Sequence, residues 1–135
     1  MPDLIGYQLR IAQRAIFADF ADAVGEIGIS PGLFGILVLI GQNPGMTQQA
    51  LANAAHLDRS TVVTVIDKLE HRGLVERRAA DRRSNGLFLA TEGETLLRSL
   101  KRKVARHEQR VVKNLSVRER AQLVGLLRRI LPERR

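Results

Sequence analysis

Hydroxyl-bearing and basic side chains gather on one face of a short segment in the middle of the chain. This polar face contains Arg59, Ser60, Thr61, Thr64 and Lys68. The opposite face is an apolar stripe of Val62, Val65, Ile66 and Leu69. Small hydroxyls can approach base edges or phosphates closely, and an arginine can form a forked contact with guanine or phosphate. The pattern predicts a helix that reads the major groove of DNA, although similar helices exist that bind no nucleic acid.

A cluster of arginines follows this segment. Residues 72–83 hold five arginines against two acids, and the cluster ends in Asp81-Arg82-Arg83. An arginine at the tip of a two-stranded wing can enter a narrow minor groove, where the negative potential is strongest. Asp81 is placed to hold the guanidinium of Arg83 in a fork. The alternative is a solvated loop with a weak surface ion pair. The arginine cluster follows the expected reading helix directly, and this position favours a DNA-contacting wing. We assign Arg77, Asp81, Arg82 and Arg83 to the wing.

Apolar periodicity and capping signals predict the elements that hold these residues. The expected helices cover 4–24, 31–40, 48–54, 59–72, 92–113 and a sixth helix that Ser116 opens and Pro132 ends, and the expected strands cover 74–78 and 87–90. The expected caps are Ser30, Thr47, Asp58 and two capping boxes, Thr91–Glu94 and Ser116–Glu119, and Asn85-Gly86 is the expected hairpin turn. The fold class is therefore mainly α, a winged helix-turn-helix with a two-stranded wing and long flanking amphipathic helices, to which the family resemblance given below assigns dimerisation.

Composition limits the classes of function. The chain has 135 residues, which fits one domain, and 22 basic against 14 acidic residues give a net charge of +8. Such a charge favours a polyanionic partner. The absence of cysteine excludes disulfides, thiolate metal sites and cysteine nucleophiles. The longest apolar run, residues 33–40, is far too short for a membrane span, and no signal peptide is evident. We expect a soluble, cytoplasmic protein without a membrane partner.

Two other classes of function remain open at this stage. An enzyme or metal site is disfavoured because His56, His71 and His107 are scattered over three elements, and no cofactor or metal is expected. His107 lies on the apolar stripe of the fifth helix, where we expect a satisfied interface histidine. A nonspecific nucleic-acid binder or membrane-surface protein could use the basic helix at 98–113. The lack of aromatic anchors on that helix weakens this alternative.

Short runs of sequence between residues 47 and 94 fit one known pattern. They are Leu51-Ala52, Asp58-Arg59-Ser60-Thr61-Val62, Leu69 to Val75, Asp81-Arg82-Arg83 and Leu89 to Gly93. Together they resemble the MarR family of winged helix-turn-helix transcription regulators. The chain departs from the family pattern at Ala79-Ala80, where a proline is frequent before the Asp-x-Arg motif.

The resemblance implies a homodimer that binds double-stranded DNA. It describes residues 1–135 as one domain, in which 1–29 and 92–135 are dimerisation helices and 30–91 form the DNA-binding lobe. It puts Arg59, Ser60, Thr61 and Thr64 on the recognition helix, Arg83 on the wing arginine and Asp81 on its carboxylate partner. We add Thr47, Gln48 and Lys68 to the expected DNA-contacting residues. Independently, apolar stripes on the terminal helices favour a twofold partner.

The resemblance also implies a small effector, typically an anionic aromatic compound. Its pocket is expected between the dimerisation helices and the lobe. The expected lining is Tyr7, Ile11, Phe17, Phe20, Phe34 and Val38, with Arg10 or Arg14 as a carboxylate partner. Plain core packing is the alternative for each of these residues. The basic surplus outside the lobe adds an aromatic acyl-coenzyme A as a candidate. The expected function is repression of a palindromic operator that the effector relieves.

Overall fold

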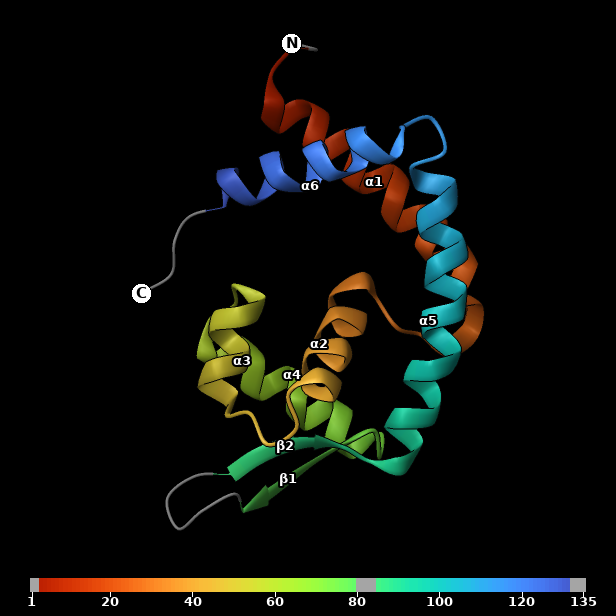
Figure 1. The fold of residues 1–135 in the computed structure, drawn as a ribbon. Helices are drawn as coiled ribbons and strands as arrows, with labels where there is room; N and C mark the ends of the chain where they lie inside the picture. Colours follow the sequence, from red (N-terminus) through yellow and green to blue (C-terminus); the bar gives the residue numbers. More distant parts are fainter. Residues whose placement is uncertain (1–2, 80–84, 132–135) are drawn as a thin grey trace.

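The computed structural model describes residues 3–79 and 85–131. Its elements are α1 (Ile5–Val24), the 3-10 turn η1 (Gly25–Ile27), α2 (Pro31–Gln42), α3 (Gln48–Ala55), α4 (Arg59–His71), β1 (Val75–Ala79), β2 (Asn85–Leu89), α5 (Thr91–Val111) and α6 (Val117–Ile130). A lobe built from α2, α3, α4 and the hairpin lies at one end of α5, and α1 and α6 lie together at its other end (Figure 1). The expected fold class, mainly helical with a two-stranded wing, is confirmed.

Side-chain caps begin most of these helices where the sequence predicts them. Ser30, Thr47, Asp58 and Ser116 each accept a hydrogen bond from the backbone N–H three residues ahead. The capping box expected at Thr91 is wrong: Ala90 is the N-cap residue, and Thr91 is already helical. The reason is that the Ala90 N–H donates to the carbonyl of Leu74 at 2.9 Å, which keeps Ala90 extended at the end of the hairpin.

The core of the lobe surrounds α2. Its fully buried members include Leu37, Ile40, Leu51, Ile66, Leu69, Leu87 and Leu100. They come from α2, α3, α4, β2 and α5, so a single cluster fixes the two short helices against the wing and the long helix. Burial of each such leucine or isoleucine contributes about 1.5–3 kcal/mol. The lobe is therefore a rigid support for whatever its surface presents.

The wing is an antiparallel pair of strands whose register runs from Val75 opposite Leu89 to Ala79 opposite Asn85. The expectation that Asn85-Gly86 turns the hairpin is wrong, because both residues lie inside β2 and pair with β1. Gly86 serves a close approach instead: a Cβ there would lie 2.8 Å from the carbonyl oxygen of Gly45. Residues 80–84, which connect the two strands in the sequence, lie outside the described residues.

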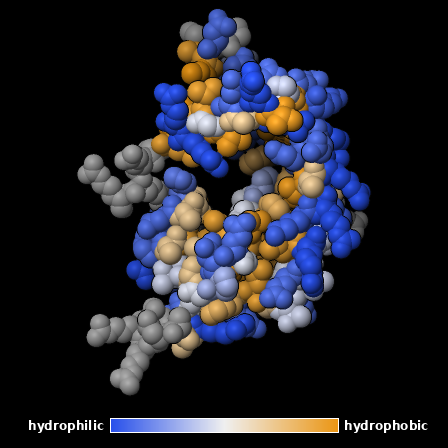
Figure 2. Space-filling model, in the orientation of Figure 1, coloured by the Kyte–Doolittle hydropathy of each residue, from blue (hydrophilic) through white to orange (hydrophobic). Residues whose placement is uncertain are grey.

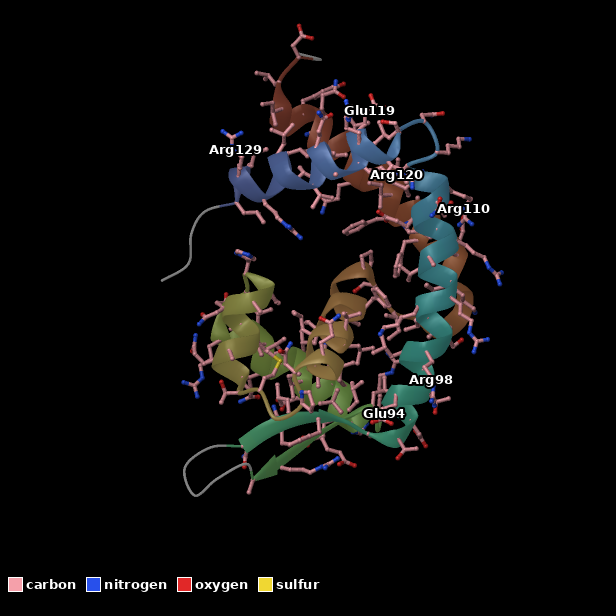
Figure 3. The ribbon with its side chains drawn as sticks, in the orientation of Figure 1. Glu94, Arg98, Arg110, Glu119, Arg120 and Arg129 are labelled. Atoms are coloured by element: carbon pink, nitrogen blue, oxygen red, sulfur yellow. The ribbon has the colours of Figure 1, made fainter. Side chains whose placement is uncertain are left out.

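α5 connects the lobe to the terminal helices (Figures 1 and 3). At its start, Gly93 packs directly on the backbone of Leu74, since a Cβ at this position would overlap the Leu74 carbonyl. Further along, α5 packs against α1, where the rings of Phe20 and His107 meet edge to face with centroids 5.3 Å apart. One continuous helix thus contacts both the base of the wing and α1.

α6 is poorly covered by the rest of its own chain. None of its residues is buried, and Leu126 and Ile130 are 54% and 55% exposed. α1 exposes Ile5 and Leu9 on the same end of the molecule. Figure 2 shows apolar residues gathered on this end. Within residues 3–79 and 85–131, no helix combines the length and apolar character needed to cross a membrane.

Candidate nucleic-acid interface

α3 and α4 form the helix-turn-helix. α3 ends at His56, which takes the left-handed conformation (φ 57°), and the N–H of Leu57 donates to the carbonyl of Ala52 at 3.0 Å. The chain then leaves α3 in a new direction, and Asp58 caps α4. α4 is anchored by the buried side chains of Val62, Ile66 and Leu69. Its other face is free to meet a large partner.

That free face carries the residues that the sequence singles out. Arg59, Ser60, Thr61, Thr64 and Lys68 are all exposed, and the helix brings them onto one surface. The Ser60 hydroxyl donates to Asp58 Oδ1 at 3.0 Å, and the Thr64 hydroxyl donates to the carbonyl of Ser60 at 3.1 Å. Both hydroxyl oxygens keep lone pairs that can accept. The surface therefore offers acceptors from hydroxyls and donors from Arg59 and Lys68.

Arg77, expected among the DNA-contacting residues, has a set of internal partners. Its Nη1 donates to Glu70 Oε1 at 2.7 Å, and its Nη2 donates to Asp67 Oδ1 at 2.7 Å. Its Nε and Nη2 donate to the side-chain oxygen of Gln48 at 3.1 and 2.9 Å, and Nη2 also reaches the Val63 carbonyl. One guanidinium thus joins β1, α3 and α4. The side chain is only 20% exposed.

This junction also gives Gln48 and Thr47 structural roles. Gln48 accepts from Arg77, and Thr47 caps α3 by accepting from the Ala50 N–H at 3.0 Å. Sequence reasoning missed the junction, although Asp67 and Glu70 are three residues apart on one helix face, which is a signal for a shared cation. Asp81, Arg82 and Arg83, the expected tip of the wing, lie outside the described residues.

The expected effector residues are split between two environments. Phe20 is buried and lies 6.3 Å from Phe34 between ring centroids, and Val38 packs on the same core. Ile11 and Phe17 are each 44% exposed on α1. Tyr7, Arg10 and Arg14 are also exposed on α1, and the guanidinium of Arg10 lies 5.5 Å from the centre of the Tyr7 ring. The single chain does not gather the eight residues around one cavity.

A titratable cluster links α1 to α5. Asp19 Oδ2 lies 2.6 Å from Nδ1 of the buried His107 and 3.2 Å from Nη2 of Arg110, whose position on α5 Figure 3 shows. Hydrogen bonds from His107 and then from Arg110 lower the pKa of Asp19 below its ordinary value of 3.8. His107 is therefore satisfied within its own chain. Sequence reasoning did not find Asp19, because 88 residues separate the two partners.

A helix-turn-helix followed by a two-stranded hairpin defines a winged helix-turn-helix DNA-binding protein. The model of the MarR family matches residues 29–84. A putative transcriptional regulatory protein for the hcr operon of Thauera aromatica is 40% identical over 129 residues, which cover 93% of this chain and 78% of that protein. The chain belongs to the MarR family of winged helix-turn-helix transcription regulators.

Solved structures agree with this assignment. The repressor CouR bound to a 23-mer DNA duplex is 36% identical with a TM-score of 0.86, over 96% of this chain and 93% of that one. CouR bound to p-coumaroyl-CoA is 34% identical with a TM-score of 0.86, over 96% and 92% of the chains. PcaV of Streptomyces coelicolor in complex with its natural ligand is 30% identical with a TM-score of 0.86, over 96% of this chain and 92% of that one. The chain is a DNA-binding transcription regulator and not an enzyme.

Proposed function

We propose that this regulator represses transcription by binding a palindromic operator as a homodimer, and that a small anionic aromatic effector releases it. The observation that carries the proposal is the exposed face of α4. It presents hydroxyls and cations on a helix whose other side is anchored in the core. Small polar groups backed by a rigid support are what base reading in the major groove requires.

The uncovered end of the molecule supports the homodimer. α1 and α6 border a groove of about 950 Å³, lined by the apolar side chains of Ile5, Leu9, Leu123, Leu126 and Ile130. Apolar surface of this extent on one face is typical of an interface. A second copy of the chain would cover it and would place two α4 helices on the same side. Paired half-sites about one helical turn apart would then be read together.

The relatives support the effector. CouR was solved with p-coumaroyl-CoA and PcaV with its natural ligand. In this chain, Tyr7, Ile11, Phe17 and the cations Arg10 and Arg14 are exposed on α1. Phe20, also on α1, is buried and packs with Phe34 and Val38 of α2. Dimer formation would add the partner's surface to these residues. We therefore keep all eight residues as the proposed lining of the effector pocket.

Binding isotherms on operator and scrambled duplexes test the proposal. Replacing Ser60 and Thr64 by alanine should weaken operator binding about tenfold or more while leaving scrambled duplex nearly unchanged, because base contacts carry the discrimination. Ser99→Ala, an exposed serine on α5, is the matched control and should change neither. Equal weakening on both duplexes would show that α4 does not read sequence. A wild-type protein that prefers no duplex would make the chain a nonspecific binder.

A further inference from the structure

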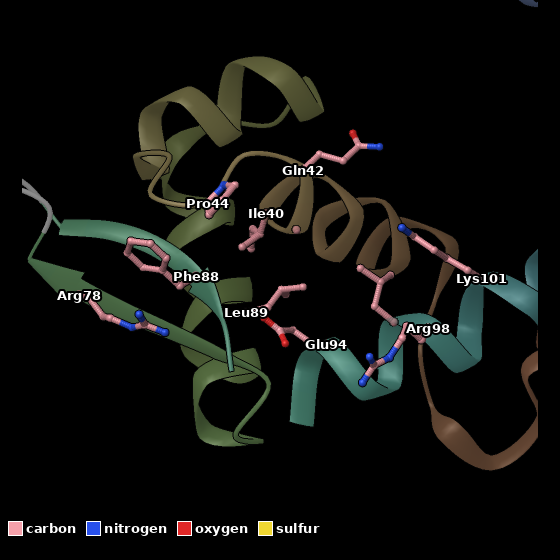
Figure 4. Close-up of a pocket in the computed structure, with 11 residues that line it drawn as sticks. Ile40, Gln42, Pro44, Arg78, Phe88, Leu89, Glu94, Arg98 and Lys101 are labelled. Atoms are coloured by element: carbon pink, nitrogen blue, oxygen red, sulfur yellow. The ribbon is translucent and has the colours of Figure 1, made fainter. Parts of the chain in front are cut away.

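A cavity lies beside the wing, and none of its lining residues comes from α4 (Figure 4). Its walls come from the end of α2, from the hairpin and from the start of α5, and its volume is about 490 Å³. None of the eight proposed effector residues lines it. The cavity is therefore a separate feature of each lobe. Its size falls in the range of 300–1,000 Å³ that is typical of sites for small organic ligands.

One part of the cavity wall is apolar. Ile40, Leu89 and Leu97 line it together with the ring of Phe88. Leu89 and Phe88 are half-buried, so a ligand in the cavity would cover surface that water now reaches. A flat apolar body would gain most from this wall, because removal of apolar area from water contributes roughly 25 cal/mol per Å².

The rim of the cavity is positively charged. Arg78, Arg98 and Lys101 line it against one acid, Glu94. Arg78 is engaged already, since it bonds Glu76 at 2.8 Å and lies 4.4 Å from the centre of the Phe88 ring.

In the part of the chain that the structure describes, the two cations of α5 on this rim have no acidic partner. Within residues 3–79 and 85–131, Arg98 and Lys101 form no ion pair, and Arg98 Nη2 makes a long contact of 3.4 Å to the Thr95 hydroxyl. They are three residues apart on α5, and Figure 4 shows both side chains extending at the edge of the cavity, across from Phe88. Two cations with free donors beside an apolar floor suit one acidic group.

We propose that this cavity binds a small organic anion with a flat apolar body. Its acidic group meets Arg98 and Lys101, and its body lies against Leu89 and Phe88. A carboxylate accepts hydrogen bonds from both cations, and its apolar part fills the space over Ile40. Glu94, which also lines the cavity, disfavours a ligand with a second acidic group.

The position of this site connects it to DNA binding, and this step rests on the proposed function. A ligand there touches α2, β2 and α5 together, so it favours one arrangement of the wing relative to α5. If the ligand and the operator favour different arrangements of the wing, the binding of each changes the affinity for the other by the same factor.

Calorimetric titration of the full chain tests the site, with 4-hydroxycinnamate as the probe. Its methyl ester, which lacks the charge, should bind at least tenfold more weakly. Arg98→Gln with Lys101→Gln should weaken the acid at least tenfold, whereas Arg98→Lys with Lys101→Arg keeps the charges and should stay within about threefold. Arg102→Gln with Arg106→Gln, two exposed cations of α5 outside the cavity, is the control of equal charge and should also stay within about threefold.

Each outcome decides the proposal. Equal weakening by the cavity pair and the control pair means that only long-range charge is felt, and it overturns the site. Binding that neither pair changes places the probe elsewhere, such as the α1–α6 groove, and also overturns it. Absence of binding at millimolar 4-hydroxycinnamate also overturns the site. Because these titrations contain no DNA, failure of the operator assay leaves their result intact, and the two proposals can fail separately.

Discussion

The Arg77 junction predicts a loss of stability that a surface arginine would not show. Arg77→Met keeps most of the apolar stem and removes the guanidinium that joins Gln48, Asp67 and Glu70. The two carboxylates stay 62% and 41% exposed, so water solvates them after the change and no charge is stranded in the core.

The magnitude follows from these exposures. Each exposed ion pair contributes about 0.2–1 kcal/mol. The part-buried hydrogen bonds to Gln48 and to the Val63 carbonyl contribute about 0.5–1.5 kcal/mol each, and such terms add incompletely. We expect the free energy of unfolding to fall by about 1–3 kcal/mol, which lowers the melting temperature by roughly 4–10 °C for a chain of this size.

Thermal and urea unfolding of Arg77→Met measures this loss, with Arg78→Met as the matched control. The guanidinium of Arg78 bonds Glu76 where both side chains are at least half exposed, and it lies 4.4 Å from the centre of the Phe88 ring, so its removal should cost about 1 kcal/mol or less. Asp67→Asn combined with Arg77→Met completes a double-mutant cycle and should show coupling between the two residues. Equal stability of the two methionine variants would refute the structural role of Arg77.

The same variant separates the internal role of Arg77 from a phosphate contact. If the guanidinium stays with its internal partners in the complex, the slope of log K against log salt is unchanged in Arg77→Met. A direct phosphate contact would instead reduce that slope by about one.

Three further predictions concern the dimer, the wing and pH. Replacing Leu126 and Ile130 together by glutamate places charges on the exposed apolar face of α6 and should abolish both the dimer and operator binding. A wild-type protein that sediments as a monomer at micromolar concentration would contradict the dimer. Arg83→Ala should weaken binding to most duplexes by roughly 1–3 kcal/mol and flatten the salt dependence, with a smaller effect for Asp81→Ala; wild-type isotherms would remove the wing assignment. Because the folded-state pKa of Asp19 lies below its ordinary value of 3.8, the ionised carboxylate stabilises the fold above pH 3.8, and this contribution is lost as the pH falls through the lowered pKa. Asp19→Asn should therefore destabilise the fold at pH 7 but not near pH 2, which urea unfolding at the two pH values would measure.

Local signals made much of the fold predictable. Ser30, Asp58 and Ser116 begin helices because each accepts from an N–H group in the next turn, so four consecutive residues of sequence contain the whole interaction. The exposed face of α4 was equally predictable, because helical periodicity alone separates it from the buried stripe. Thr91 failed as a cap because a hydrogen bond from Ala90 to a residue 16 positions earlier sets the helix start.

Contacts between distant residues explain what the sequence could not provide. Arg77 and Gln48 are 29 residues apart, and their bond depends on how α3, α4 and β1 pack. The environment of Phe20 also depends on contacts between distant residues, because an aromatic residue on a helix stripe fits a ligand pocket or a core equally well. The packing of α1 on α5 buries it against His107 and Phe34. The cavity beside Arg98 and Lys101 could not be predicted because most of its apolar wall belongs to α2 and β2.

The continuity of α5, fixed on the hairpin through Gly93 and on α1 through His107, makes it a lever. Its 21 residues form a rod about 30 Å long at 1.5 Å per residue. A tilt of roughly 10° about the end near α6 would move the other end by about 5 Å, which exceeds the 3.4 Å rise of one base pair. In the proposed dimer, two such levers would pivot at a shared base and would carry the two α4 helices at their far ends. Small rotations far from the DNA would then change the spacing between those helices.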